Sequence, residues 1–335
     1  MRYFFVSFLS ITFCMATSIS NAENMGDVIT NNIDKTQAGH VALVDIAKKR
    51  LVQIDSKGKV VWSTKIPEEF GKANLNAATD IEWLTPTDTF LVGVPDTGFF
   101  EINRKGETLK VCKNKHISHD VDKLKDGSFI FINGWDDKGK DEPILTKVSA
   151  SCKVEWIKKR AFFGVDEADL QPRYADDKAV LHSNSVRILS DDQIMVSIRN
   201  YDQVVVIKDD RIIKRFKNAP GVHDPSKVYT DKDGDFFYYL NRGRPNKINK
   251  RNFNSPETKS TTVWEGPRSR KRAWNPLRTL EKLKNGNWLV TGSREIGQVS
   301  ADGELVWEMY FPKFRHQRGK NKNITFIYKV AFIEK

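Results

Sequence analysis

Short apolar segments recur along the chain, and most of them alternate apolar and polar residues or are rich in β-branched residues. They are LVQID, FLVGV, GSFIFIN, QIMVSI, DFFYYL and NWLVTG. Clusters of Gly, Asp, Asn or Lys bound each segment, as is typical of strands joined by tight turns. Because helical periodicity is almost absent, the chain is predicted to be all-β.

These segments belong to a longer repeat whose last strand ends in an apolar or aromatic residue. The six strand-ending pieces are SKGKVVW, RKGETLKV, SASCKVEW, KDDRIIKRF, ETKSTTVW and ADGELVW. A period of roughly 40 residues with four short strands per unit is typical of a β-propeller, because one blade cannot bury both of its faces alone. Six units predict six blades.

The two ends of the repeat array complement each other. The first unit, HVALVDIAKKRLVQIDSKGKVVW, supplies about three strands, whereas ITFIYKVAFIE near the end is a strand without a unit. We therefore expect the C-terminal strand to complete the first blade and to close the ring.

The N-terminal segment has the pattern of a secretory signal peptide. An apolar run extends from Phe4 to about Ala16, and small residues precede a cleavage site near Ala22. The run is too short to span a bilayer. We expect a signal peptide at 1–22, a polar lead-in at 23–40 and one propeller domain at 41–335, in a protein that is periplasmic or secreted and has no membrane span.

Cys112 and Cys152 are the two cysteines outside the signal peptide. Export favours a disulfide, but the repeat register places the two residues at opposite ends of the outer strands of neighbouring blades. Their Cα atoms would then exceed the distance of about 7 Å that a disulfide permits, so we predict that they are not bonded.

The chain has a formal net charge of +12. Solvated charge on loops, which carry the basic runs RPNKINKR, PRSRKRAW and FRHQRGKNK, is one interpretation, and attraction of an anionic partner or substrate is the other. Because exported proteins do not meet nucleic acid as a rule, a nucleic-acid partner is not expected.

Three of the six histidines, His119, His182 and His223, each open a repeat. In a propeller the first strand of each blade lines the central channel, so these side chains are expected to meet at one mouth of the channel. A single buried histidine is usually structural. Three histidines at matching positions of consecutive blades favour a functional site.

The second strand of each blade ends at the same mouth, because it runs antiparallel to the first. Asn184 lies two residues after His182 and therefore on the same face of its strand. The second-strand ends add four more candidates, which are Arg199, Arg294, Arg242 and Trp135. Trp135 and Trp274 are candidates for an aromatic wall, with blade packing as the alternative.

This composition bears on the chemistry of the site. Three histidines could bind zinc. Arginines beside them would repel a dication, however, and they suit a tetrahedral oxyanion held by planar guanidinium groups. We therefore expect a phosphate, sulfate or sulfuryl site with no metal and no cofactor.

At these residues the chain resembles the bacterial arylsulfate sulfotransferase family, whose members are exported six-bladed propellers that do not use PAPS. The resemblance lies in HSNSV followed by VSIRN, in HD at His119, in VHDP at His223 and in LKNGNWLVTGSREIGQVSADGELVWE. It covers about residues 117 to 310. The family's additional N-terminal β-rich domain, which pairs its subunits, has no counterpart here, so the oligomeric state stays open.

The resemblance implies transfer of a sulfuryl group from an aryl sulfate to a phenol through a sulfated histidine. His223 matches the nucleophile. Arg199, Asn184 and His119 match the groups that hold the sulfuryl oxygens, and His182 matches either that role or proton exchange with the phenol oxygen. The remaining substrate-binding candidates are Arg294, Arg242, Trp135 and Trp274.

Two alternatives belong to other classes. The first is a non-catalytic propeller whose basic mouth binds an anionic glycan or another exported protein. The second is a zinc-dependent propeller lyase or lactonase that uses the histidines as ligands.

Overall fold

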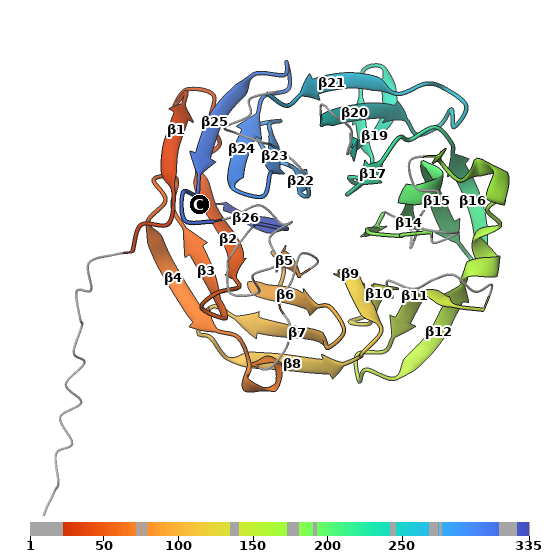
Figure 1. Cartoon of the computed structure of the whole chain (residues 1–335), viewed down its shortest axis with the longest axis horizontal. Helices are drawn as coiled ribbons and strands as arrows, with labels where there is room; N and C mark the ends of the chain where they lie inside the picture. Colours follow the sequence, from red (N-terminus) through yellow and green to blue (C-terminus); the bar gives the residue numbers. More distant parts are fainter. Residues whose placement is uncertain are drawn as a thin grey trace, which may run out of the picture.

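A computed structural model of the chain shows six antiparallel sheets arranged around a central channel (Figure 1). It describes residues 23–71, 75, 79–134, 141–172, 181–189, 193–241, 246–267, 274, 277–314 and 327–334. The signal peptide predicted at 1–22 lies outside these residues. The prediction of an all-β, six-bladed propeller is confirmed.

Each sheet is one blade, and its strands follow one another from the channel outwards. Blade 1 consists of β26 (Val330–Glu334), β2 (Gly39–Asp45), β3 (Arg50–Ile54) and β4 (Val60–Lys65). Blade 2 consists of β5 (Asp80–Leu84), β6 (Thr89–Val94), β7 (Gly98–Asn103) and β8 (Thr108–Lys113). Blade 3 consists of β9 (Ile117–Lys123), β10 (Phe129–Asn133), β11 (Pro143–Val148) and β12 (Val154–Lys159).

The other three blades repeat this order. Blade 4 consists of β13 (Val186–Ile188), β14 (Ile194–Ile198), β15 (Gln203–Lys208) and β16 (Arg211–Phe216). Blade 5 consists of β17 (Val222–His223), β18 (Tyr229–Asp231), β19 (Gly234–Asn241), β20 (Lys247–Asn252) and β21 (Thr261–Glu265). Blade 6 consists of β22 (Leu280–Lys282), β23 (Trp288–Thr291), β24 (Glu295–Val299) and β25 (Leu305–Tyr310), with β1 (Asp27–Asn31) on its outer edge.

Helical structure in the described residues is limited to short 3₁₀ turns. They are η1 (Glu68–Phe70), η2 (Arg160–Phe163), η3 (Glu167–Asp169) and η6 (Arg199–Tyr201). Among the helices that the structure describes, none is long and apolar enough to cross a membrane.

The ring closes at both ends of the described chain. The C-terminal strand β26 pairs antiparallel with β2, with Phe332 opposite Val41, and so forms the innermost strand of blade 1, as predicted. The segment expected to be a polar lead-in contains a further strand, β1, which pairs with β25 of blade 6. Two exposed sheet edges are thereby covered.

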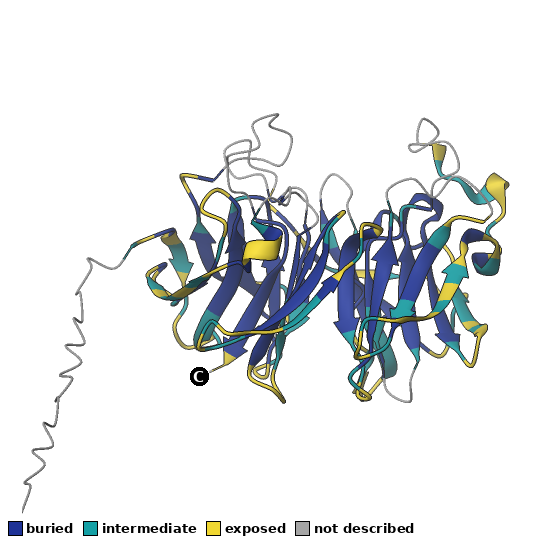
Figure 2. Ribbon diagram, turned by 90° about the horizontal axis from the view of Figure 1, so that it is seen from below, coloured by how far each residue is buried: buried dark blue, intermediate teal, exposed yellow. Residues whose placement is uncertain are grey.

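Most strand residues are buried (Figure 2), and the apolar core lies between neighbouring blades. One cluster joins Ile130 and Ile132 of blade 3 to Val186 and Val196 of blade 4, and all four are buried. Each blade therefore buries one face against the blade before it and the other against the blade after it, which explains why the fold needs the complete ring.

Cys112 and Cys152 form a disulfide, with Cα atoms 5.7 Å apart, so the prediction that they are not bonded is wrong. The cause is blade twist, which accumulates from the channel outwards. Figure 1 shows that the outermost strand β8 runs along the rim of the ring and ends near β12. The end of one outer strand thus meets the start of the next.

Candidate functional site

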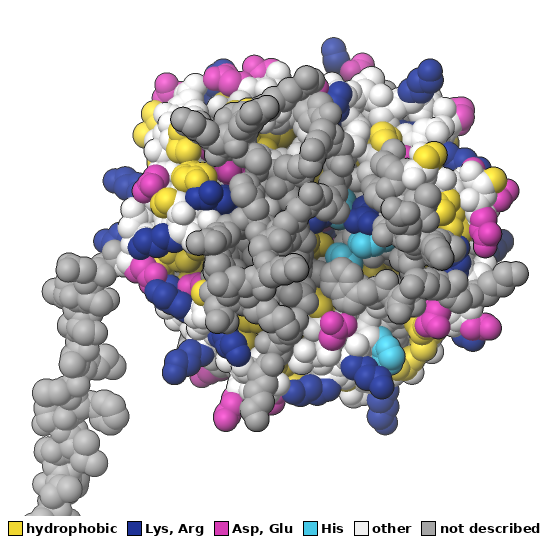
Figure 3. Space-filling model, in the orientation of Figure 1, with side chains coloured by type: hydrophobic (Ala, Val, Ile, Leu, Met, Phe, Trp, Pro, Cys, Tyr) yellow, Lys and Arg dark blue, Asp and Glu magenta, His cyan; other side chains and the backbone are white. Residues whose placement is uncertain are grey.

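Five of the predicted site residues lie together at one mouth of the channel, joined by two that were not predicted. We call this group the mouth cluster, and it consists of His119, His182, Asn184, Arg199, His223, Arg278 and Tyr328. Figure 3 shows imidazole and basic side chains side by side near the centre of the ring on this face.

The innermost strands place these residues by a common backbone arrangement. In four blades, the residue that comes two positions after the mouth residue donates its backbone N–H to a side chain of the preceding blade. Val121 donates to Asp80 at 3.2 Å, Val186 to Asp120 at 2.9 Å, Leu280 to Asp224 at 2.7 Å and Val330 to Thr279 at 3.1 Å. The residues two positions earlier, His119, Asn184, Arg278 and Tyr328, are therefore structurally equivalent.

His223 occupies the same position in blade 5, where the corresponding residue is Pro225. Proline has no N–H to donate. Ser185 of the preceding blade has its Oγ 3.4 Å from Oδ1 of Asp224 instead. The inner strand of blade 5 is accordingly short, two residues in β17.

The imidazole of His223 is buried and faces two donors. Nδ2 of Asn184 lies 3.1 Å from its Nε2, and Nη1 of Arg278 lies 3.0 Å from the same nitrogen. Oδ1 of Asn184 accepts from Ser197 at 2.7 Å, which fixes the amide orientation. Because a guanidinium can only donate, Nε2 of His223 is the acceptor, and its lone pair points into the mouth cluster.

His119 is buried beside His182, with ring centroids 5.3 Å apart. Burial, followed by the positive charges of Arg278 and Arg199, lowers the pKa of His119 well below its ordinary value. His119 is therefore neutral at neutral pH. His182 has a left-handed backbone (φ 50°), a conformation that costs energy in a residue with a Cβ and is often found at functional sites.

Arg199 begins η6, immediately after β14, as expected for the end of a second strand. It is buried, and its Nε and Nη2 each lie 3.1 Å from Oδ1 of Asn200. We include Arg199 in the mouth cluster because it follows β14, the strand paired with the inner strand after Asn184, and because its charge, after burial and Arg278, lowers the pKa of His119.

Arg294 does not join the mouth cluster through any contact that the structure describes. Its Nη2 donates to the carbonyl of Pro312 at 2.9 Å, and its guanidinium lies over the ring of Tyr310 at 4.6 Å. The side chain therefore holds the end of β25, and the substrate-binding role predicted for it has no geometric support.

Trp274 packs in the core between blades 5 and 6. It is 1% exposed and meets Trp264 edge to face, with ring centroids 5.9 Å apart. The alternative of blade packing is therefore the correct one. Arg242 and Trp135 lie outside the described residues.

The sequence analysis missed Arg278 and Tyr328. The guanidinium of Arg278 lies over the ring of Tyr328 at 5.0 Å and also contacts His223. A signal was present, because NPLRTLEKL and IYKVAFI align with SHDVDKL once the blades are superposed in register. The histidines alone did not reveal it.

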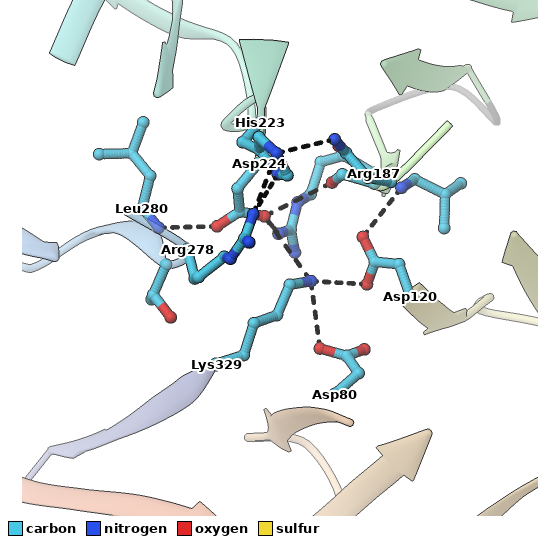
Figure 4. Close-up of polar contacts among 12 residues, drawn as sticks. Asp80, Asp120, Arg187, His223, Asp224, Arg278, Leu280 and Lys329 are labelled. Atoms are coloured by element: carbon cyan, nitrogen blue, oxygen red, sulfur yellow. Dashed lines mark hydrogen bonds and ion pairs between the residues drawn. The ribbon is translucent and has the colours of Figure 1, made fainter. Parts of the chain in front are cut away.

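A second set of charges lies deeper on the same strands, and we call it the belt; its carboxylates and Lys329 lie one residue beyond the mouth positions, and Arg187 lies three residues beyond Asn184. It consists of Asp80, Asp120, Asp224, Arg187 and Lys329 (Figure 4). Lys329 is buried, and its Nζ lies 2.8 Å from Asp120 and 3.1 Å from Asp80. Arg187 lies 3.1 Å from Asp224.

One group in the described residues has ligand atoms close enough to share a metal ion, and it consists of Asp80 and Asp120 of the belt together with Glu82 beside them. Lys329 already contacts two of these carboxylates, and Arg187 lies 3.0 Å from Glu82. Burial is the main cause that raises the pKa of Asp80 and of Glu82 well above their ordinary values. The geometry thus favours internal cations over a metal here, and it does not group the three histidines around one ion.

No family model and no curated protein sequence matches the chain. Similar solved structures include a protein of unknown function from Bacteroides caccae, with a TM-score of 0.58 and 11% identity over 89% of this chain and all of that one. A streptogramin B lyase has a TM-score of 0.51 and 12% identity over 88% of this chain and 85% of that one. A gluconolactonase from Xanthomonas campestris has a TM-score of 0.51 and 9% identity over 87% and 89%. At such identities these likenesses show the propeller fold alone.

Proposed function

We propose that the mouth cluster transfers a sulfuryl group from an aryl sulfate to a phenol through His223, as the resemblance to the arylsulfate sulfotransferase family implies. The observation that carries the proposal is the pair of donors at Nε2 of His223, Asn184 at 3.1 Å and Arg278 at 3.0 Å. They surround the atom that would bond to sulfur, so they are positioned to donate to sulfuryl oxygens.

The reaction divides into two displacements at sulfur. In the first, the lone pair on Nε2 forms the N–S bond while the S–O bond to the aryl group breaks, and the phenolate that leaves takes up a proton. In the second, the acceptor phenol loses its proton, its oxygen attacks sulfur, and the N–S bond breaks. The imidazole is regenerated, and the two phenols need not be bound together.

The other residues of the cluster support charge and proton transfer. Arg199 and Arg278 provide planar donors for oxygens whose charge grows in the transition state. Neutral His119 can donate a hydrogen bond without adding a charge. His182, beside His119, is the candidate for exchanging the proton of the phenol oxygen.

We also propose that the protein is exported to the periplasm or secreted. The apolar segment at 1–22 supports this proposal. The Cys112–Cys152 disulfide supports it too, because such bonds persist in oxidising compartments.

The test is incubation of the purified protein with an aryl sulfate in the absence of an acceptor. We expect a burst of about one phenol per site and one added sulfuryl group on the peptide that contains residue 223. His223→Asn should abolish both signals without lowering the melting temperature. His40→Asn is the matched control, because His40 lies in β2 of blade 1 and contacts Gln53 rather than the mouth cluster.

Other results would select a different function. The protein could instead bind sulfate but release no burst of phenol from any of a panel of aryl sulfates. That result would favour a non-catalytic propeller that binds an anionic glycan or protein. Loss of activity on chelation, with about one zinc per chain, would favour the lyase or lactonase alternative.

A further inference from the structure

Lys329 lies on the chain just before β26, the strand that closes the ring, and its ammonium reaches three other blades. Nζ is 3.1 Å from Asp80 of blade 2, 2.8 Å from Asp120 of blade 3 and 3.7 Å from Asp224 of blade 5 (Figure 4). The residue is 7% exposed. One side chain therefore acts as a shared counter-ion for three inner strands that are far apart in sequence.

Each of these carboxylates also carries a backbone contact that sets the position of a mouth residue. The second oxygen of Asp120 accepts the N–H of Val186 at 2.9 Å, two residues beyond Asn184. The second oxygen of Asp224 accepts the N–H of Leu280 at 2.7 Å, two residues beyond Arg278. The oxygens that face Lys329 and the oxygens that hold the next strand thus belong to the same carboxylates.

The carboxylates are also direct chain neighbours of the mouth residues. Asp120 follows His119, Asp224 follows His223, and Lys329 itself follows Tyr328. A shift of the belt therefore moves the imidazoles and the guanidinium that face one another at the mouth.

We propose that Lys329 is a positioning residue for the mouth cluster, which it holds in its binding geometry through Asp120 and Asp224 without touching the substrate. The effect of Lys329 on turnover rests on the proposed function, whereas its effect on the geometry and the electrostatic field of the mouth cluster does not. Without the ammonium, the buried carboxyl groups of three blades lose their shared cation, so they repel one another or take up protons, and either change breaks the contacts that Lys329 made. The inner strands then move apart, and the donors around His223 separate.

The first test is an NMR titration of the histidine rings in the full-length protein, which has only six histidines. The titration midpoint of His119 should move upward in Lys329→Met, because Lys329 is one of the cations that hold the pKa of His119 down. The other groups that face this ring are present in both proteins, and they are Arg278, Arg199, Asp120, His182 and Tyr328.

The second test measures binding of inorganic sulfate by calorimetry. Sulfate affinity should fall about tenfold in Lys329→Met, since the mouth donors lose their alignment. The double variant Asp80→Asn with Lys329→Met removes one carboxylate charge and keeps an oxygen that can accept from Val121. It should restore affinity to within about threefold of the wild type, and it keeps the test valid where the single variant folds poorly.

Glu334→Gln is the matched control. Glu334 ends β26, the strand that follows Lys329, and pairs with Lys284 at the surface. It should change neither sulfate affinity nor the titration of His119.

A purely structural role for Lys329 predicts a different outcome. The melting temperature would fall in Lys329→Met, but the folded protein would bind sulfate as the wild type does, whatever the direct effect of the lost charge on the titration of His119. That result, or a double variant that regains thermal stability but not sulfate affinity, would overturn the proposal. A wild type that binds sulfate but gives no aryl-sulfate burst would reject sulfuryl transfer and leave the positioning role intact.

Discussion

The mouth cluster and the belt occupy neighbouring positions on the same inner strands, yet their chemistry is opposite. At the mouth, Asn184 and Arg278 direct N–H groups at His223. In the belt, the carboxylates accept from Lys329, from Arg187 and from the backbone of the next blade. At the mouth, the side chains around His223 donate hydrogen bonds. In the belt, the carboxylates accept them, and Lys329, Arg187 and backbone N–H groups of the same chain are the donors.

The difference shows how one strand serves two purposes. Successive side chains of a strand point to opposite faces. Adjacent residues can therefore serve different purposes, one facing the mouth and the next contacting a neighbouring blade. Buried acids that receive internal cations and backbone N–H groups hold the ring together. Buried donors around a neutral imidazole are suited to an external anion. Substitutions in the two layers should therefore differ in what they change.

The largest effect is expected in the belt. Arg187→Met removes the cation that lies 3.0 Å from Glu82 and 3.1 Å from Asp224. The buried carboxylate of Asp224 and the partly buried one of Glu82 are left without it, so the free energy of unfolding should fall by about 3 kcal/mol. Urea unfolding measures this loss. The comparison is the loss of unfolding free energy when a surface ion pair such as Lys35 with Glu304 is removed. A smaller loss in Arg187→Met would mean that the belt does not stabilise the contacts between blades.

A smaller free-energy effect, of a different kind, is expected at the mouth. Arg278→Lys keeps the charge but loses the planar arrangement of donors beside His223. Turnover of an aryl sulfate should fall about 100-fold, or roughly 2.7 kcal/mol in the barrier, with little change in the melting temperature. Steady-state kinetics and thermal melts on the same samples provide the comparison. Equal losses of stability in Arg278→Lys and Arg187→Met would remove the distinction between the two layers.

The most gradual effect concerns pH and a carboxyl beside the belt. Burial, the largest cause, raises the pKa of Glu281 from 4.5 to about 7. Its side chain accepts the N–H of Phe332 on the closing strand at 3.2 Å. Between about pH 4.5 and 7 the unfolded chain loses this proton first, so the contribution of Glu281 to stability is full below pH 4.5 and declines as the pH rises to about 7.

Glu281→Gln mimics the protonated carboxyl and should lack this decline. Relative to the wild type, the variant should gain about 3 kcal/mol in the free energy of unfolding as the pH rises from 4.5 to 8, which is less than about 1 kcal/mol per pH unit. Urea titrations at several pH values measure the gain. Parallel curves for the two proteins would show that Glu281 is ionised in the folded ring.

The repeat pattern was sufficient to predict the fold, because blade length, turn residues and the missing first strand are local features of the sequence. It also placed His119, His182, Asn184, Arg199 and His223 in one cluster. Arg294 shares the strand-end position of Arg199, but its side chain is held by carbonyls at the end of β25. Strand position determines which mouth a residue is near, and it does not determine side-chain direction.

The remaining errors have a common physical origin in twist and packing between blades. The disulfide forms because the outer strands lean along the rim of the ring. Counting residues along the repeat does not reveal this tilt. Trp274 is buried because the neighbouring blade supplies Trp264. Recognising Arg278 and Tyr328 from the sequence required an alignment of all six inner strands. One of these strands, β26, is far in sequence from the rest of its blade.

Pairing between β2 and β26 joins nearly the first and the last described strands in chain order. Contacts of such long sequence separation form late, because the loop-closure entropy must be overcome before they stabilise the fold. We therefore expect Tyr328 and Lys329 to reach their partners after the other blades have formed. Under the proposed function, sulfate binding would then appear only in the last step of refolding, and its time course would report completion of the ring.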